Sequence, residues 1–144
     1  ETTAAPWPGM LAAQFAGAIA GVVLAHAMFD LVLLQLSGKP RASVGLWISE
    51  IVATSGLLAL IALSGKASLD SIAARVGGYI FAAYWFTAST SFANPAVTVA
   101  RMFSDTFAGI APASLPMFVG AQLVALLLVM GVLRATQSAS NGAR

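Results

Sequence analysis

The chain has 144 residues, of which 59% are hydrophobic and only 8% are charged, with a formal net charge of +2 at pH 7. A soluble domain carries roughly 25% charged residues, so the composition excludes an ordinary soluble domain and indicates a protein whose main solvent is lipid. The small positive charge excludes the strongly basic surface of a nucleic-acid-binding protein. The absence of cysteine excludes a disulfide framework and thiolate chemistry.

The chain begins with ETTAAPWPG, which contains two prolines and starts at Glu1 rather than at a methionine. No basic segment precedes an apolar run here, so this stretch does not have the pattern of a signal peptide. We interpret residues 1–9 as a linker or a cut point and expect the chain to be part of a longer protein.

Four apolar segments follow in chain order. A transmembrane helix needs about 20 apolar residues to cross about 30 Å of hydrocarbon. The segments that meet or nearly meet this length are residues 10–36, 45–63, 72–88 and 115–133. The last is followed by a polar tail, residues 135–144. We therefore predict an all-α membrane protein with one transmembrane domain over residues 1–144.

Small residues recur at helical spacing in these segments. Gly17 and Gly21 form GxxxG with Ala13 on the same face, and Gly78 and Ala82 repeat the spacing. Such faces let helix backbones approach closely in lipid, so they favour a tight bundle over a lone anchor.

A few polar residues stand inside the apolar segments. Gln14 and Gln122 each open an apolar helix, in LAAQF and VGAQL, and we interpret both as helix-packing hydrogen-bond partners. His26 and Asp30 are four residues apart and share a helix face, where they could bind a metal or titrate. We favour an interfacial pair. No pattern resembles a nucleophile with its base, a phosphate loop or a metal cluster, which predicts a protein that is not an enzyme and uses no cofactor.

The stretch TSFANPAVTVAR, residues 90–101, places an Asn-Pro pair in apolar surroundings. Pro95 suits the first turn of a helix and Asn94 is a good N-cap. From Asn94 to about Phe103 the helix would span about 15 Å, half of the hydrocarbon core. This predicts a re-entrant half-helix that starts at mid-depth; the alternative is an ordinary N-cap in a surface loop.

Glu50, in WISEIVATSGLLAL, is the one acidic residue well inside a predicted span. A carboxylate there is costly unless it is paired or hydrogen-bonded, which makes it a functional-site candidate. Loop N–H groups before Asn94 need acceptors at membrane depth, and Glu50 could supply them. The alternative is an interfacial glutamate that snorkels.

Asn94-Pro95-Ala96 resembles the NPA signature of the aquaporin superfamily, the major intrinsic proteins. Four further stretches, in order, are similar to the third to sixth helices of that family: AQFAGA, WISEIVAT, VGGYIFAAYW and LPMFVGAQL. The resemblance covers about residues 10–134. It implies four transmembrane helices plus one re-entrant half-helix braced by Glu50, with the first two spans and the first NPA missing.

The resemblance also identifies selectivity-filter positions. Water-selective relatives carry arginine directly after NPA, and this chain has Val97; the other filter positions fall on Ser91 and near Ala82. Such a filter would be wider and less polar, which implies passage of glycerol or undissociated arsenous acid alongside water. The pattern is similar to a bacterial branch associated with arsenic resistance. Arg101 could supply a cation in the vestibule or pair with Asp105, which we favour.

The function implied is a passive channel in which Asn94 caps the half-helix and offers its NH₂ group to passing hydroxyls, while the helix dipole disfavours cations. The alternatives are a secondary transporter with a broken-helix site and a non-conducting partial channel. The partners implied are the lipid bilayer and small neutral solutes, in a homotetramer in the bacterial inner membrane, without nucleic acid.

Overall fold

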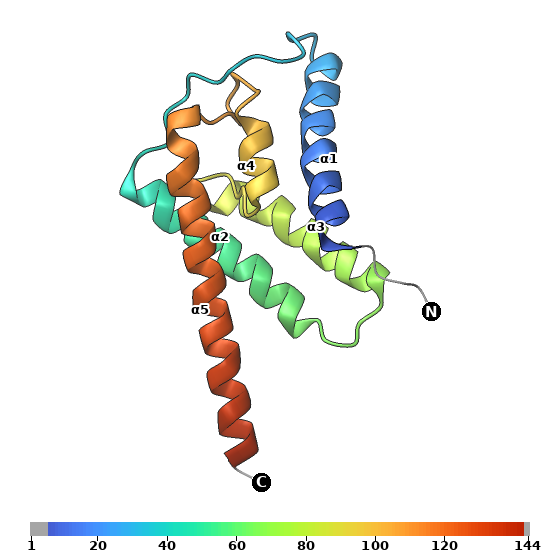
Figure 1. The fold of residues 1–144 in the computed structure, drawn as a ribbon, viewed down its shortest axis with the longest axis vertical. Coiled ribbons are helices and arrows are strands. Elements are labelled where there is room, and N and C mark those ends of the chain that lie inside the picture. Colours follow the sequence, from blue (N-terminus) through green and yellow to red (C-terminus); the bar gives the residue numbers. More distant parts are fainter. Residues whose placement is uncertain (1–5, 143–144) are drawn as a thin grey trace. The chain divides into compact units, whose positions relative to one another are not determined.

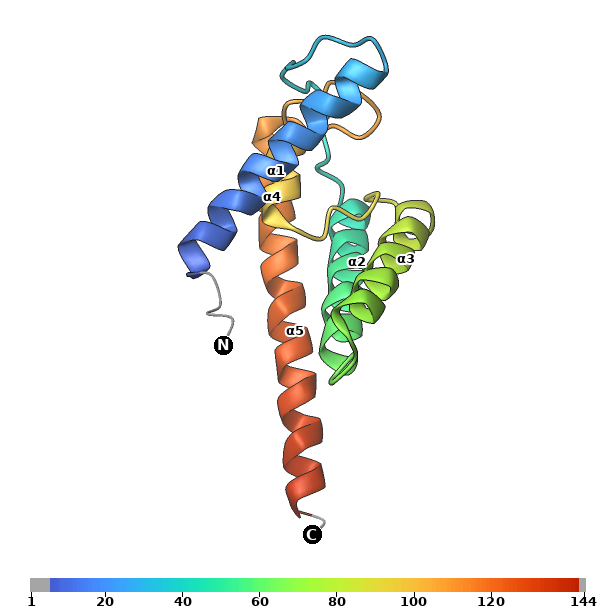
Figure 2. The same ribbon diagram turned by 90° about the vertical axis from the view of Figure 1, so that its right-hand side faces the viewer.

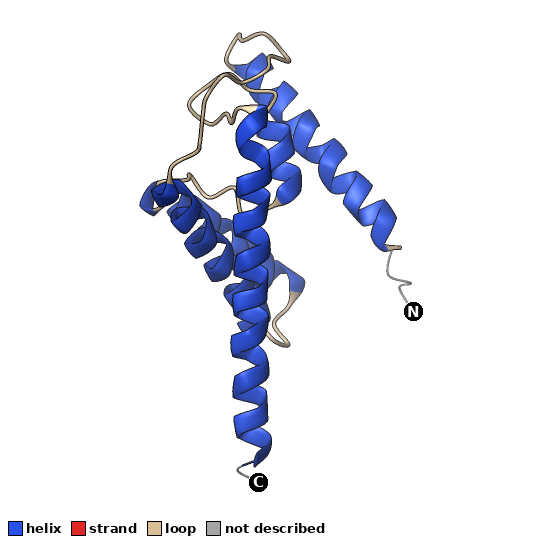
Figure 3. Cartoon of the chain, turned by 60° about the vertical axis from the view of Figure 1, so that its left-hand side comes forward, coloured by secondary structure: helices blue, strands red, loops and turns tan. Residues whose placement is uncertain are grey.

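The computed structural model describes residues 6–142, with side chains as far as residue 139. Within these residues all regular structure is helical (Figure 3), as the sequence predicts. The elements in chain order are α1 (Trp7–Met28), α2 (Val44–Leu63), α3 (Leu69–Phe86), α4 (Pro95–Arg101), a 3₁₀ turn η1 (Pro112–Ser114) and α5 (Leu115–Gly142).

The chain forms two compact units. The first comprises the residues up to Ala42 together with Asn94–Pro116, and α1 and α4 lie side by side in it (Figures 1 and 2). The second comprises Ser43–Ala93 and the chain from Met117 on, and α2 packs against α3 in it. We describe each unit by itself.

Serine N-caps start two of the helices. The Ser43 hydroxyl accepts from Leu46 N at 3.3 Å at the start of α2, and the Ser68 hydroxyl accepts from Ser71 N at 3.3 Å at the start of α3. Each bond satisfies one of the N–H groups that a helix leaves without a partner in its first turn.

The first and last helices extend beyond the boundaries that the sequence predicts. α1 begins at Trp7, so residues 7–9 of the predicted linker are helical, while residues 1–5 lie outside the described part of the chain. α5 continues to Gly142, so the predicted polar tail is helical up to that residue.

The first apolar run does not stay helical to residue 36, and this boundary was predicted wrongly. α1 ends at Met28, and Asp30 adopts a left-handed conformation with φ +53°. The segment after α1 is held against the end of that helix by His26, whose Nδ1 lies 2.8 Å from Val32 O and 3.0 Å from Leu33 O. An imidazole N–H replaces helical partners for these carbonyls, which an apolar residue count does not reveal.

Three helices among the described residues are long and apolar enough to cross a membrane: α1, α2 and the helix that includes α5. The prediction of a multi-pass membrane protein is therefore confirmed. α3 occupies the place of the third predicted span but carries Asp70 and Arg75 in its first two turns, and it is not among the three.

The close helix approach occurs at a glycine other than those predicted. A Cβ atom on Gly17 or Gly21 would meet nothing within 4 Å among the described residues. A Cβ atom on Gly56 of α2 would instead collide with the Tyr79 hydroxyl of α3, which donates to Ala53 O at 2.8 Å. Gly56 is thus the small residue that lets Tyr79 lie against α2.

Candidate functional site

The short helix α4 starts as the sequence predicts. Asn94 is its N-cap, and the side-chain Oδ1 accepts from Ala96 N at 2.7 Å. Pro95 occupies the first turn, where its missing N–H leaves no intrahelical bond unmade. The helix ends at Arg101, slightly before the predicted end, so it is about 10 Å long.

The loop that leads to Asn94 has a strained backbone. Thr90, Ser91 and Ala93 have φ values of +62°, +46° and +52°. The left-handed region costs a residue with a Cβ atom roughly 1–2 kcal/mol. Such a conformation persists only where surrounding contacts hold it.

The Glu50 carboxylate supplies the main contacts that hold this loop. Its Oε2 accepts from Phe92 N at 3.2 Å, and its Oε1 accepts from Ala93 N at 2.6 Å and from Gln122 Nε2 at 2.9 Å. Glu50 is 0% exposed. A buried carboxylate with three donors forms charge-assisted bonds and is not left unpaired. This is the contact that the sequence analysis expected of Glu50.

Other side chains of the second unit support the same loop. The Ser49 hydroxyl accepts from Ser89 N at 3.0 Å, and the Ser89 hydroxyl accepts from Ser91 N at 3.2 Å. The Phe92 ring lies 5.1 Å from the Phe118 ring of α5, centroid to centroid. The loop is therefore fixed through its N–H groups on one side and through an aromatic contact on the other.

In the first unit, Gln14 of α1 contacts the N-cap asparagine. Gln14 Oε1 accepts from Asn94 Nδ2 at 3.0 Å. From the sequence we interpreted Gln14 and Gln122 only as packing residues, whereas in the structure they bind Asn94 and Glu50. The sequence did contain a signal for these contacts, because Gln14 and Gln122 are isolated polar residues in apolar runs, as Glu50 is.

A buried arginine holds the loop that follows α4. Arg41 is 3% exposed, and its Nε donates to Gly109 O at 2.7 Å while its Nη2 donates to Phe107 O at 2.9 Å. Lys39 Nζ also donates to Phe107 O, at 3.0 Å, and lies 4.5 Å from the centroid of that ring. This cluster was not predicted from the sequence, because Arg41 and Lys39 bind backbone carbonyls that are far away along the chain.

The interfacial position of His26 and Asp30 stays a prediction, and both ring nitrogens of His26 contact groups other than Asp30. His26 is buried, and its Nε2 lies 2.8 Å from Ser104 Oγ, in the loop after α4. Ser104 Oγ is in turn 2.8 Å from Thr106 Oγ1. His26 therefore ties the end of α1 to the loop after α4.

The predicted filter residues are distributed over both units. Ala82 is exposed on α3, and the buried Ser91 hydroxyl has no hydrogen-bond partner among the described residues. Both belong to the second unit, whereas Val97 lies half-buried on α4 in the first unit. Their assignment to one filter stays a prediction.

Arg101 is the last residue of α4 and is half-buried. Asp105 Oδ1 accepts from Gly38 N at 3.0 Å, which ties the loop after α4 to the loop after α1. The vestibule role of Arg101 and its pairing with Asp105 stay predictions.

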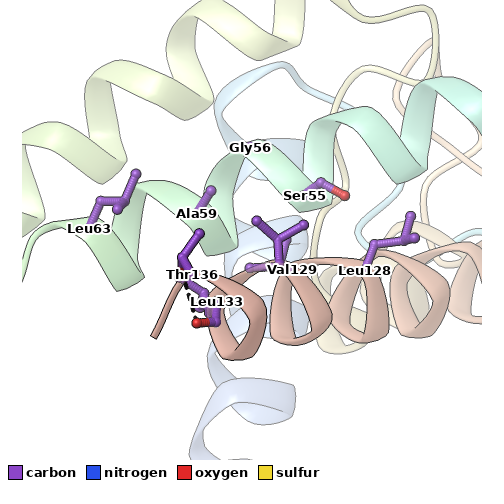
Figure 4. A pocket seen from close by; sticks show the side chains of 9 residues that line it. Ser55, Gly56, Ala59, Leu63, Leu128, Val129, Leu133 and Thr136 are labelled. Carbon is purple, nitrogen blue, oxygen red and sulfur yellow. Dashed lines mark hydrogen bonds between the residues drawn. The ribbon is translucent and has the colours of Figure 1, made fainter. Parts of the chain in front are cut away.

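An apolar groove of about 450 Å³ runs between α2 and α5 in the second unit (Figure 4). The Thr136 hydroxyl at its edge donates to Leu133 O of its own helix at 2.9 Å. The lining contains no titratable side chain and consists of Ser55, Gly56, Ala59, Leu63, Leu128, Val129, Val132, Leu133 and Thr136. The groove has no polar constellation that could do chemistry.

These features define a class of protein. Three apolar helices long enough to cross a membrane, with a short helix that starts at an Asn-Pro N-cap and a loop braced by a buried carboxylate, are typical of a polytopic membrane protein. Among the described residues, no three His, Cys, Asp or Glu side chains lie close enough together to hold a metal ion.

The chain is 52% identical to an aquaglyceroporin, AqpS of Rhizobium meliloti (strain 1021), over 122 residues. The match covers 85% of this chain and 52% of that protein, so the chain spans about half the length of the relative. No family model and no solved structure matches. The chain is therefore a partial homologue of an aquaglyceroporin, in agreement with the resemblance to the aquaporin superfamily. Aquaglyceroporins are channels and not enzymes, also in agreement with the prediction.

Proposed function

We propose that the chain forms part of a passive pore for small neutral solutes, namely water, glycerol and undissociated arsenous acid. The observation that carries the proposal is the Asn94-capped half-helix that directly follows a loop braced by Glu50. The match to a protein named an aquaglyceroporin supports the choice of solute class.

In this proposal, α4 enters the membrane from one side and begins at mid-depth, and α3 serves as a fourth span. Non-helical backbone at that depth is tolerated only where it is buried in protein or lines a wet cavity. The N-terminal end of α4 carries a partial positive charge that opposes cations. The Asn94 NH₂ group donates to solute hydroxyls as they pass.

We assign the narrow filter of the pore to Ala82, Ser91 and Val97. The buried Ser91 hydroxyl, without a partner among the described residues, is suited to bind one solute hydroxyl. Val97 and Ala82 contribute apolar surface and leave room where a longer side chain would narrow the opening. In this assignment Arg101 lies one turn outward from Val97, in the vestibule.

The complete pore would require more than this chain supplies. About half of the relative lies outside the match, which is consistent with two further spans and a first NPA half-helix. We propose that the complete protein assembles as a homotetramer in the bacterial inner membrane, with one pore in each subunit.

A secondary transporter is the competing function. Transporters place ion-coordinating groups at broken helices. Among the described residues Glu50 is the one buried carboxylate, and its two oxygens already accept from three donors. That engagement favours a structural role for Glu50 over ion coupling.

Solute flux into proteoliposomes distinguishes these functions. Vesicles that contain the protein should swell in a glycerol or arsenous acid gradient faster than empty vesicles, without saturation and without any ion gradient. Saturable uptake that requires a sodium or proton gradient would favour the transporter. Flux that is absent from this chain alone and restored by adding the upstream spans would identify it as a non-conducting part of the pore.

A further inference from the structure

The Asn94 side chain is held at both ends of its amide. A carboxamide has one acceptor oxygen and two N–H donors. Asn94 Oδ1 accepts from Ala96 N at 2.7 Å, and Asn94 Nδ2 donates to Gln14 Oε1 at 3.0 Å. One N–H of Asn94 remains after these two bonds.

These contacts fix the orientation of both amides. A backbone N–H can only donate, so the Asn94 atom that faces Ala96 N must be the oxygen. The NH₂ group then faces Gln14, and the Gln14 atom that faces it must be Oε1. The direction of the remaining Asn94 N–H is therefore set by two contacts, of which one is with a side chain of α1.

Gln14 is also poorly explained as a packing residue. Its side chain is exposed, and its neighbours in AAQFAGA are apolar or small. An amide on an apolar membrane helix is unfavourable without a partner. The bond to Asn94 supplies that partner, and α1 and α4 lie side by side in both views (Figures 1 and 2).

We propose that Gln14 is a positioning residue that sets the direction of the free Asn94 N–H and thereby tunes solute selectivity. The proposal rests on the proposed channel function. With Gln14 in place, Asn94 presents one donor in a fixed direction. Without it, the Ala96 N–H still holds Oδ1, but the amide is fixed at one end only, and both Asn94 N–H groups seek solute or water.

The effect should differ between solutes. Water can reorient to meet a misaligned donor, whereas glycerol in a narrow pore presents its hydroxyls in an order set by its carbon chain. Loss of the Gln14 acceptor should therefore lower glycerol flux more than water flux. Loss of one neutral hydrogen bond predicts about a fivefold fall in the glycerol-to-water permeability ratio.

Three variants of the full-length protein test the positioning role of Gln14 in proteoliposomes. Gln14→Met keeps side-chain length but removes the acceptor, and its glycerol-to-water ratio should fall about fivefold. Gln14→Glu keeps an acceptor oxygen and should restore the ratio to within about twofold of the wild type. Gln137→Met makes the same change at an exposed position of α5 and should leave the ratio unchanged. The ratio does not depend on how much protein folds, so a merely structural role would not change it.

The proposal would be overturned if Gln14→Met had the same glycerol-to-water permeability ratio as the wild type, or if it lost water and glycerol flux equally. Amide NMR of Asn94 in the wild-type protein gives a second test that needs no flux. One side-chain N–H should exchange more slowly than the other, and Gln14→Met should abolish the difference. Equal exchange in the wild type would also overturn the proposal. If the difference in exchange is present but no neutral solute permeates, the proposed channel function is wrong, whereas the contact between Gln14 and Asn94 is confirmed.

Discussion

The two units hold consecutive parts of one segment in different ways. In the second unit, a fully buried carboxylate, Glu50, binds the backbone N–H groups of Phe92 and Ala93. In the first, an exposed neutral amide, Gln14, binds the side chain of Asn94. A strained backbone needs several strong bonds, whereas a side chain needs only orientation. Glu50 should therefore determine whether the loop forms, and Gln14 how the finished site selects solutes.

Replacing Glu50 with leucine should have the largest effect. The variant leaves Phe92 N, Ala93 N and Gln122 Nε2 without their acceptor, at about 1–3 kcal/mol for each buried donor. We expect a loss of about 3 kcal/mol or more in unfolding free energy and loss of flux for every solute. Denaturant titration of the purified protein measures the first and vesicle swelling the second.

Asp70→Leu is the matched control, because it removes an exposed carboxylate in the first turn of α3. It should change unfolding free energy by less than about 1 kcal/mol. Comparable losses in the two variants would contradict the view that Glu50 acts through its loop contacts.

Two glycines extend the comparison between the units. A Cβ atom on Gly109 would collide with the backbone oxygen of Ser104, which cannot easily move, so Gly109→Ala should cost about 1–3 kcal/mol. A Cβ atom on Gly56 would meet the Tyr79 hydroxyl, which can swing away, so Gly56→Ala loses the bond to Ala53 O, worth about 1 kcal/mol, and regains part of it from the helix preference of alanine.

Gly77→Ala controls for both changes, since nothing lies within 4 Å of the added atom among the described residues. Alanine in a helix is favoured over glycine by roughly 0.5–1 kcal/mol, so this variant should be slightly stabilised. The same denaturant titration ranks the three variants. Equal stability of Gly109→Ala and Gly77→Ala would show that the loop after α4 can adjust.

Gln122→Met should have a smaller effect than Glu50→Leu, and it separates the roles of the two glutamines. It removes one of three donors to Glu50, at about 1.5–3 kcal/mol for a bond to a charged group, partly offset by apolar burial. We expect reduced unfolding free energy but an unchanged glycerol-to-water ratio. A changed ratio with unchanged stability would reverse the roles of Gln14 and Gln122.

The sequence reveals features whose signal is local. The Asn94-Pro95 cap and the acidic Glu50 could both be identified from the sequence, because each residue is unusual among its own neighbours. The end of α1 was not predictable from the apolar run. His26 acts through Ser104, 78 residues away, and Gln14 through Asn94, 80 residues away. Hydrophobic periodicity carries no information on such partners.

The filter assignment is the part of the site that rests most heavily on resemblance. It depends on Val97, a residue with no unusual chemistry whose importance comes only from its place after Asn94-Pro95-Ala96. Arg101 is the more conspicuous residue in the same helix but lies at its last position.

Val97→Arg in the complete protein tests the central claim most directly. Glycerol and water permeability are measured in the same vesicles, so that their ratio is independent of the amount of folded channel. An arginine at the narrow point should lower the glycerol-to-water ratio by at least about tenfold, equivalent to about 1.4 kcal/mol, while water still passes. Equal loss of both fluxes, or an unchanged ratio, would contradict the assignment of Val97 to the filter.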